Sequence, residues 1–288
     1  MSSNKWVLGA RPRTLPAAIS PVLVGTALAY RQSSEFNYIN ILLALIVSLS
    51  LQVAVNYAND YSDGIKGTDE KRVGPVRLVG SGLASAASVK RAAYISFAVA
   101  GVAGSLLALR TSLWLILVGV ISIIAAWRYT GSSKPYGYRG LGEISVFIFF
   151  GIVATVGTFY AGSRTLSWSA LLVSIPVGAL ACALLAINNL RDLPKDALVG
   201  KRTLAVRLGD QKARVFFIVL LLGAHLFALI SISITPWSAL TLLLLPLTFS
   251  ILKAIRAGAH GVELIPLLGQ TGRLQLLLST TLAISLLL

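Results

Sequence analysis

The sequence predicts an all-α polytopic membrane protein, with about nine transmembrane helices bundled around a central cavity and two Asp-rich loops on the cytoplasmic side. Of its 288 residues, 56% are hydrophobic and only 12% are charged. A soluble domain is roughly 45–50% apolar and about 25% charged. The apolar residues form long runs, and six of the ten acidic residues fall in two of the segments between them. These observations exclude a soluble globular domain, a disordered chain and a fibrous repeat.

A helix that crosses a bilayer needs about 20 mostly apolar residues, and nine stretches of the sequence approach that length. The last of them is short, which allows its helix to start as early as Gly261. We expect one transmembrane domain over residues 1–288, with a structural repeat that relates spans one to four to spans five to eight. The predicted spans lie at roughly 15–30, 38–58, 92–109, 112–127, 143–161, 168–188, 215–234, 237–252 and 273–288.

The basic residues predict which side of the membrane each loop occupies. With the N-terminus inside, 22 of the 25 Lys and Arg residues fall on inner segments, and only Arg31, Arg110 and Arg164 fall outside. Because inner loops carry the excess of Lys and Arg, we expect a multi-pass protein of the cell membrane. Its N-terminus and acidic loops would be cytoplasmic and its C-terminus outside. The net charge of +15 then reflects topology and attraction to anionic lipid, so we expect membrane lipid as a partner, no nucleic acid and no obligate protein partner.

The first acidic segment follows the second predicted span. On a helix, with about 100° per residue, Asn56, Asp60 and Asp63 share one face. Gly64 comes directly after them and is a predicted C-cap for the helix. Carboxylates near membrane depth are costly unless they face a cavity and have partners. We therefore expect this face to line a cavity.

The second acidic segment follows the sixth predicted span and opens with the same pattern. Asn188 and Asp192 are four residues apart, and so are Asp192 and Asp196. Pro194 lacks a backbone N–H and is predicted to break the helix between the two acids. Since each segment places Asn four residues before Asp at the end of an even-numbered span, we expect the two clusters to face each other across the cavity.

The residue types in these clusters indicate their chemistry. Carboxylates and amides offer hard oxygen ligands, which suit Mg²⁺, and the single Cys182 with the distant His225 and His260 argues against a Cys or His metal site. Lys and Arg residues adjoin both clusters, and cations beside metal-binding carboxylates suit a diphosphate. An apolar bundle below such a mouth suits a long hydrocarbon tail. The residues therefore predict a Mg²⁺-assisted site for a lipid diphosphate.

The two acidic segments resemble the Asp-rich motifs of the UbiA superfamily of intramembrane aromatic prenyltransferases. They read NYANDYSDGIKGTDE at 56–70 and NNLRDLPKDALVGKRTLAVRLG at 188–209. The chain is most similar to the branch that prenylates 1,4-dihydroxy-2-naphthoate in menaquinone biosynthesis, through RPRTLP at 11–16, GPVRLVGSG at 74–82 and KPYGYRGLGE at 134–143. One departure from the commoner spacing is that Asp60 and Asp63 are three apart, with the next acid at Asp69.

The resemblance implies that Mg²⁺ assists departure of diphosphate from a polyprenyl diphosphate, leaving an allylic cation. A ring carbon of 1,4-dihydroxy-2-naphthoate would attack that cation with loss of CO₂, giving demethylmenaquinol. The catalytic residues implied are Asp60, Asp63, Asp192 and Asp196, which together with Asn56 would hold the metal. The substrate-binding residues implied are Arg13 at the aromatic carboxylate and, toward the diphosphate, Asn56, Arg72, Lys134, Asn188, Lys201 and Arg202.

Two alternatives stay open at this point. The first is prenylation of another aromatic acceptor, such as 4-hydroxybenzoate, which would release no CO₂, or a chlorin. The second is a cation transporter in which two Asp-containing broken helices bind the ion near the midplane, although both clusters lie at span ends. The prenyl chain length, the oligomeric state, the role of Asp69 and the route of product release do not follow from the sequence.

Overall fold

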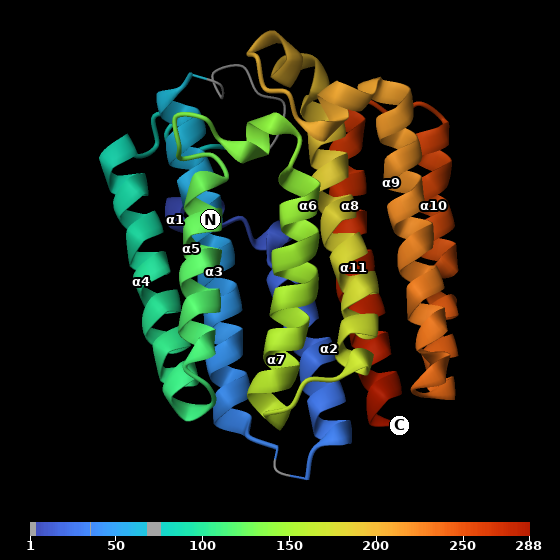
Figure 1. The fold of residues 1–288 in the computed structure, drawn as a ribbon. Coiled ribbons are helices and arrows are strands. Elements are labelled where there is room, and N and C mark those ends of the chain that lie inside the picture. The colour runs from blue at the N-terminus through green and yellow to red at the C-terminus, as the bar shows by residue number, and fades with distance from the viewer. Residues whose placement is uncertain (1–3, 35, 68–75) are drawn as a thin grey trace.

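The computed structural model describes residues 4–34, 36–67 and 76–288, and every regular element in those ranges is a helix. The long helices run side by side as a bundle (Figure 1), which confirms the predicted all-helical class. They are α2 (Pro16–Gln32), α3 (Tyr38–Ile65), α4 (Ala86–Arg110), α5 (Trp114–Arg128), α8 (Trp168–Leu198), α9 (Leu204–Ile230), α10 (Leu245–Arg256) and α11 (Leu264–Leu287).

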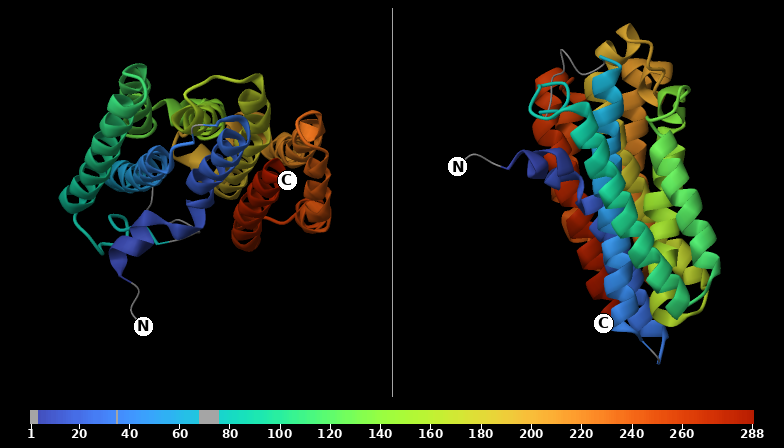
Figure 2. Two further views of the ribbon diagram at one scale, coloured as in Figure 1. Left: turned by 90° about the horizontal axis from the view of Figure 1, so that it is seen from below. Right: turned by 90° about the vertical axis from the view of Figure 1, so that its left-hand side faces the viewer.

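Shorter elements complete the described chain. Between α5 and α8, α6 (Gly142–Val146), the π-helix η3 (Phe147–Val153) and α7 (Ala154–Ser163) follow one another without a break. Before α2, the short α1 (Lys5–Ala10) lies crosswise to the long helices (Figure 2). The other short elements are η1 (Pro12–Thr14), η2 (Tyr136–Arg139), η4 (Ser231–Ser233), η5 (Pro236–Leu244) and η6 (Gly261–Glu263).

Within the described ranges, six helical stretches are long and apolar enough to cross a membrane, namely 38–65, 86–110, 142–163, 168–198, 204–233 and 236–256. A multi-pass membrane protein is therefore confirmed. The last helical segment starts at Gly261 with η6, the early start that the sequence allows, and continues without a gap into α11 at Leu264. The predicted substrate residue Arg72, like Asp69, lies outside the described residues.

The end of α3 differs from its prediction at Gly64. The helix continues past it to Ile65, with Lys66 as the C-cap and Gly67 at a φ of 67°. Inside the helix, Gly64 has another use, since a Cβ there would lie 2.4 Å from Val79 Cγ1. The glycine therefore lets the segment around Val79 approach the helix closely.

Pro194 does not break its helix, contrary to the prediction. Helix α8 continues through it to Leu198. The turn after the proline is closed by its own hydrogen bonds, because the N–H of Val199 donates to the Lys195 carbonyl at 3.1 Å and that of Lys201 donates to the Asp196 carbonyl at 2.8 Å. Asn188, Asp192 and Asp196 therefore share one continuous helix.

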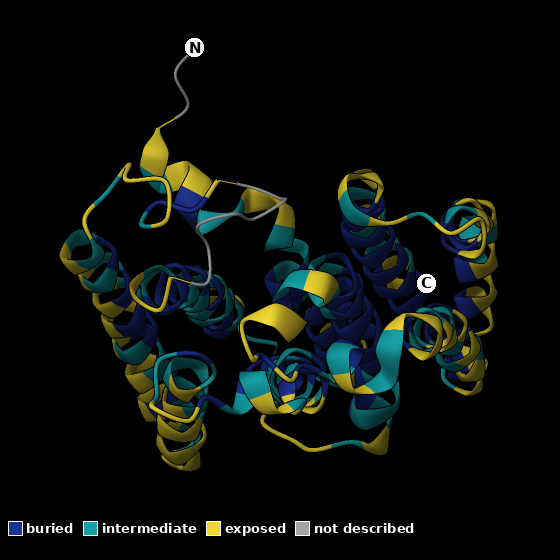
Figure 3. Cartoon of the chain, turned by 90° about the horizontal axis from the view of Figure 1, so that it is seen from above, coloured by how far each residue is buried: buried dark blue, intermediate teal, exposed yellow. Residues whose placement is uncertain are grey.

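Burial is uneven across the bundle (Figure 3). Helix α8 is packed on many sides, and residues such as Leu180, Ile187 and Leu190 join the largest buried cluster with α9, α10 and α11. Helix α5, in contrast, contains no buried residue. Apolar side chains on such an outer helix are suited to contact with lipid, whose interior is as apolar as a protein core.

Candidate active site at the ends of two helices

The C-terminal ends of α3 and α8 lie at the same end of the bundle, at the top of Figure 1, beside η2 and the link from α8 to α9. Side chains from these segments surround a polar pocket of about 90 Å³. The pocket brings together both Asp-rich motifs, which are more than a hundred positions apart in the sequence. Its polar lining includes Arg11, Asn59, Asp63, Arg77, Tyr138, Asn188, Asn189, Asp192, Lys195, Asp196, Lys201 and Thr203.

Asp63 joins the two motifs. Lys201 Nζ donates to its Oδ1 at 3.1 Å, Arg77 Nη2 lies 3.8 Å from its Oδ2, and the Tyr138 hydroxyl donates to Oδ1. Lys201 also lies over the Tyr138 ring, 4.6 Å from the centroid. Because Asp63 and Lys201 are both buried, their attraction is less screened than at a surface. Lys201 and Arg77 can each leave the Asp63 carboxylate and bind an anionic ligand in its place.

Lys66 adds a further cation near this pocket. Its Nζ donates to the Thr130 carbonyl at 2.8 Å and lies 5.0 Å from the Tyr138 ring centroid. Burial lowers the pKa of Lys66 below its usual value, Lys201 lowers it further, and Asp63 opposes both. Crowding of ammonium groups at this point favours a bound anion, which would relieve their mutual repulsion.

The second motif is held mainly from within α8. The Arg191 guanidinium donates to both oxygens of Asp192 at 2.8 Å and to Asn188 Oδ1 at 2.7 Å. Asn189 Nδ2 donates to the buried Glu143 Oε1 at 2.9 Å, which anchors the motif to α6. Lys195 Nζ is buried and has no hydrogen-bond partner among the residues that the structure describes. An ammonium group in that position is suited to an incoming phosphate oxygen.

Asp60 and Asn56 are engaged elsewhere. The fully buried Asp60 accepts the backbone N–H groups of Leu78 at 2.8 Å and Val79 at 3.0 Å, so it fixes the segment that carries Arg77 into the pocket. Asn56 Nδ2 donates to the Ala10 carbonyl at 2.8 Å. Neither side chain lines the polar pocket, and both are engaged in hydrogen bonds to other parts of the chain.

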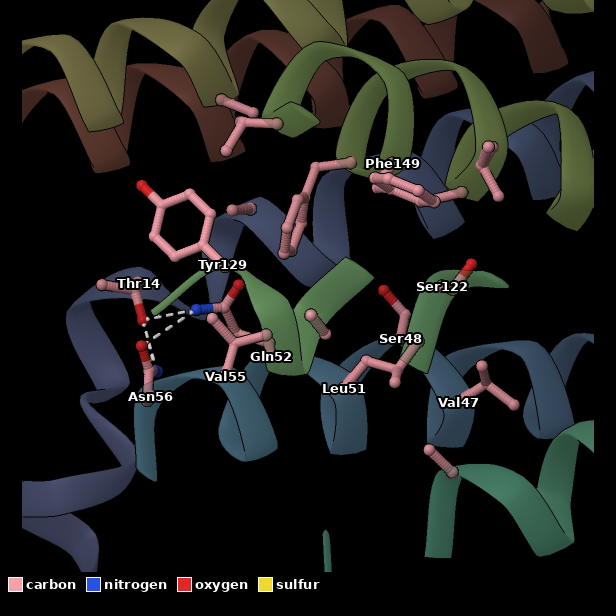
Figure 4. A pocket seen from close by; sticks show the side chains of 18 of the residues that line it. Thr14, Val47, Ser48, Leu51, Gln52, Val55, Asn56, Ser122, Tyr129 and Phe149 are labelled. Carbon is pink, nitrogen blue, oxygen red and sulfur yellow. Dashed lines mark hydrogen bonds between the residues drawn. The ribbon is translucent and has the colours of Figure 1, made fainter. Parts of the chain in front are cut away.

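A larger cavity of about 730 Å³ lies directly below the polar pocket, between α3, α4, α5, η3 and α7 (Figure 4). Most of its wall is apolar, with Val47, Leu51, Val55 and Phe149 among the lining residues. On α3 the lining extends from position 44 to position 59, about 22 Å of helix. The cavity and the polar pocket share Arg11, Asn59, Arg77, Tyr129, Leu185 and Asn188.

The other predicted site residues separate into two groups. Lys201 and Asn188 line the polar pocket, and Arg13 lines the large cavity at η1. Lys134 and Arg202 are exposed and line neither space. The sequence pattern did not single out Arg11, Asn59 or Tyr138. It placed Arg77 and Lys195 only among the basic residues that adjoin the clusters, since basic residues near a span end are also expected from topology alone.

The donor set suits a hard divalent cation. Asp63, Asp192 and Asp196 bring carboxylate oxygens to one pocket, and Asn59 and Asn188 bring amide oxygens. Among the described residues, no three acidic, His or Cys side chains are close enough to hold a metal ion by themselves. This partial set fits Mg²⁺, which takes one or two carboxylates from a protein and completes its shell with waters and substrate phosphates.

Comparison with known proteins gives a consistent result. The UbiA prenyltransferase family model matches residues 18–260. The chain is 50% identical to a 1,4-dihydroxy-2-naphthoate octaprenyltransferase of Mycobacterium tuberculosis over 94% of this chain and 92% of that one. It is 39% identical to the enzyme of the same name from Escherichia coli over 93% and 90%.

Solved structures share the fold at low sequence identity. A UbiA homolog from Archaeoglobus fulgidus bound to GPP and Mg²⁺ superimposes with a TM-score of 0.71 and 14% identity over 99% of both chains. The apo structure of a UbiA homolog from Aeropyrum pernix K1 gives 0.70 and 17% over 94% of this chain and 95% of that one. The motifs, the fold and the family match agree, and the chain belongs to the UbiA prenyltransferase family.

Proposed function

We propose that this protein transfers a polyprenyl group from a polyprenyl diphosphate to 1,4-dihydroxy-2-naphthoate. Diphosphate and CO₂ leave, and demethylmenaquinol forms as a step of menaquinone biosynthesis. Relatives named for this reaction are up to 50% identical over most of the chain. The observation that carries the proposal is that the polar pocket adjoins a long apolar cavity, with six lining residues in common. One amphipathic substrate, with a charged head and a hydrocarbon tail, fits both spaces at once.

The basic residues of the polar pocket would bind the diphosphate. Lys195 Nζ is buried beside the pocket without a described partner, and Lys201 and Arg77 point toward Asp63. When the carbon–oxygen bond breaks, negative charge grows on the leaving diphosphate. Fixed cations stabilise that charge more in the transition state than in the ground state, which lowers the barrier to ionisation.

Asp63, Asp192 and Asp196 are the proposed metal ligands that line the pocket. Asn56 and Asp60 remain ligands proposed from the sequence, and both make hydrogen bonds to backbone groups outside the polar pocket. When bound, Mg²⁺ supplies positive charge at the diphosphate oxygens. Arg191 holds Asp192 in place through two hydrogen bonds, so the carboxylate is oriented before the substrate arrives.

The large cavity would hold the prenyl chain and protect the allylic cation. Val47, Leu51 and Val55 of α3 present an apolar wall, and Phe149 extends into the same space (Figure 4). A wall of this kind keeps water from the cation, which would otherwise be lost to hydrolysis. Aromatic faces are also attracted to positive charge.

We also propose the full membrane arrangement. Nine helical stretches would cross the bilayer as one domain, including α2, α5 and α11 besides the six that qualify by length and apolarity. The polar pocket would face the cytoplasm, where most Lys and Arg residues gather, and the C-terminus would lie outside. Lipid would surround α4 and α5, whose outer faces carry exposed apolar residues such as Val102, Leu109 and Ile121.

The proposal is tested by mass spectrometry of reactions with the purified protein in detergent. Each reaction contains Mg²⁺, a polyprenyl diphosphate of defined length and either 1,4-dihydroxy-2-naphthoate or 4-hydroxybenzoate. We expect a prenylated, decarboxylated naphthoquinol, and a parallel reaction with EDTA should give none. Product from 4-hydroxybenzoate alone would overturn the acceptor. If folded protein gives no product with either acceptor and sealed liposomes show cation transport without lipid diphosphate, the enzyme proposal is wrong.

A further inference from the structure

Gln52 is a buried polar residue of the large cavity that the binding of a diphosphate and a prenyl chain does not use. Gln52 lies on α3, one helical turn deeper than Asn56, and is 6% exposed. Its side chain lines the cavity close to the junction with the polar pocket. No described residue donates a hydrogen bond to its Oε1 atom, whereas its Nε2 atom is fully engaged.

Neighbouring hydrogen bonds fix the orientation of this amide. The Thr14 hydroxyl donates its only hydrogen to the Arg11 carbonyl at 2.9 Å, so toward other groups it can only accept. Gln52 must therefore present Nε2 to Thr14, at 3.1 Å, and the same atom donates to Asn56 Oδ1 at 3.3 Å. Both amide hydrogens are used, and Oε1 is left pointing away from Thr14 into the cavity (Figure 4).

The chemistry of Oε1 limits which ligand can satisfy it. An amide oxygen accepts hydrogen bonds and cannot donate them. An ionised diphosphate has acceptors alone to offer, and a prenyl chain has neither donors nor acceptors. Of the substrates in the proposed function, on which this inference rests, only the dihydroxynaphthoate brings hydroxyl groups that can donate.

We propose that Gln52 Oε1 binds a ring hydroxyl of the aromatic acceptor and so determines acceptor specificity. The ring then lies at the level of Gln52, below the diphosphate and at the upper end of the tail cavity. Tyr129 and Phe149 line the cavity at this level and supply apolar and aromatic surface for a flat bicyclic ring. A buried acceptor left without a donor is costly, so an acceptor analogue that lacks the matching hydroxyl binds less well.

The first test uses the unaltered protein and needs no variant. Steady-state kinetics compare 1,4-dihydroxy-2-naphthoate with 1-hydroxy-2-naphthoate and 4-hydroxy-2-naphthoate, each of which lacks one hydroxyl. We expect KM for one of the two analogues to rise about tenfold, as for the loss of one buried hydrogen bond. Equal KM values for all three compounds would overturn the inference.

The second test replaces the amide. Gln52→Leu should raise KM for the naphthoate about tenfold and leave KM for the polyprenyl diphosphate within about twofold. For the analogue that already lacks the matching hydroxyl, Gln52→Leu should not raise KM further. Ser50→Ala is the matched control, because Ser50 lies on the same helix but lines neither space, and it should leave both KM values unchanged.

The outcomes separate this inference from the proposed function. An active Gln52→Leu variant with unchanged acceptor KM, or with an equal rise for both substrates, overturns the inference and leaves the proposed function standing. Absence of product from the unaltered protein overturns the proposed function and the inference with it. If Gln52→Leu does not fold, Gln52→Met keeps the length of the side chain and removes the oxygen, and the analogue series remains decisive.

Discussion

The two Asp-rich motifs end their helices on the same side of the bundle, but the structure uses their acids differently. In the first motif, Asp60 accepts two backbone N–H groups from Leu78 and Val79, and Asp63 is held by Lys201 from the far part of the chain. In the second motif, Asp192 is held by Arg191, its direct neighbour. The acids Asp60 and Asp63 of the first motif are therefore held from distant parts of the chain, whereas Asp192 of the second is held by its neighbour on the same helix.

This difference separates two roles that the sequence pattern does not distinguish. In the first motif, Asp60 builds the pocket by fixing the segment of Arg77, and Asp63 lines the pocket. Both acids of the second motif line the pocket. Substitutions in the first motif should therefore affect stability and activity together, whereas those in the second should act mainly on activity.

The largest effect is expected from Asp63→Asn and Asp192→Asn. Each should lower turnover by about 100- to 1,000-fold, because a fixed charge that organises the leaving diphosphate is lost. The two should differ in stability. Asp63→Asn leaves the buried Lys201 without its carboxylate and should cost about 1–3 kcal/mol of unfolding free energy, whereas Arg191 keeps Asn188 as a partner in Asp192→Asn.

Product formation by mass spectrometry and thermal unfolding in detergent measure both quantities. Size-exclusion chromatography shows whether each variant remains folded and monodisperse. Normal turnover in either variant would contradict the site. Equal losses of stability would contradict the contrast between the motifs.

An intermediate effect is expected from Asp60→Ala. It removes the acceptor for the N–H groups of Leu78 and Val79 and should lower the unfolding free energy by about 1–3 kcal/mol. Turnover should fall about tenfold because Arg77 loses its fixed position, an effect that Arg77→Ala should reproduce. The double variant should then be little worse than either single one, as for two residues that act through one contact.

A double-variant cycle with a Mg²⁺ titration decides between the two roles of Asp60. If Asp60 acts through Arg77, the concentration of Mg²⁺ that gives half-maximal rate stays unchanged. A large increase in that concentration, with losses that multiply in the double variant, would instead make Asp60 a metal ligand as the sequence implies.

The smallest effect is expected at an adjacent pair of basic residues. Lys201 is buried and lines the pocket, whereas Arg202 is exposed and does not. Lys201→Ala should raise KM for the polyprenyl diphosphate at least about tenfold, and Arg202→Ala should change it by less than about threefold. Initial rates over a range of diphosphate concentrations measure both, and similar KM values for the two variants would argue against the pocket as the diphosphate site.

The sequence by itself determined the helices and the residues that can carry charge chemistry. Long apolar runs must form helices in a bilayer, since every backbone N–H and C=O needs an internal partner there. The same reasoning places the acidic motifs at helix ends, and the family resemblance gives the reaction. Two local rules failed, at Gly64 and Pro194, because packing and the hydrogen bonds of the following turn outweighed them.

Only the tertiary structure decided which way each polar side chain is used. Asp60 and Asp63 are close in sequence and similar in type, yet one binds a distant backbone segment and the other lines the pocket. The orientation of Gln52 likewise depends on Thr14 from another helix. Short-range patterns fix the face of a helix on which a residue lies, but the segment packed against that face determines its hydrogen-bond partners, and that segment comes from distant parts of the chain.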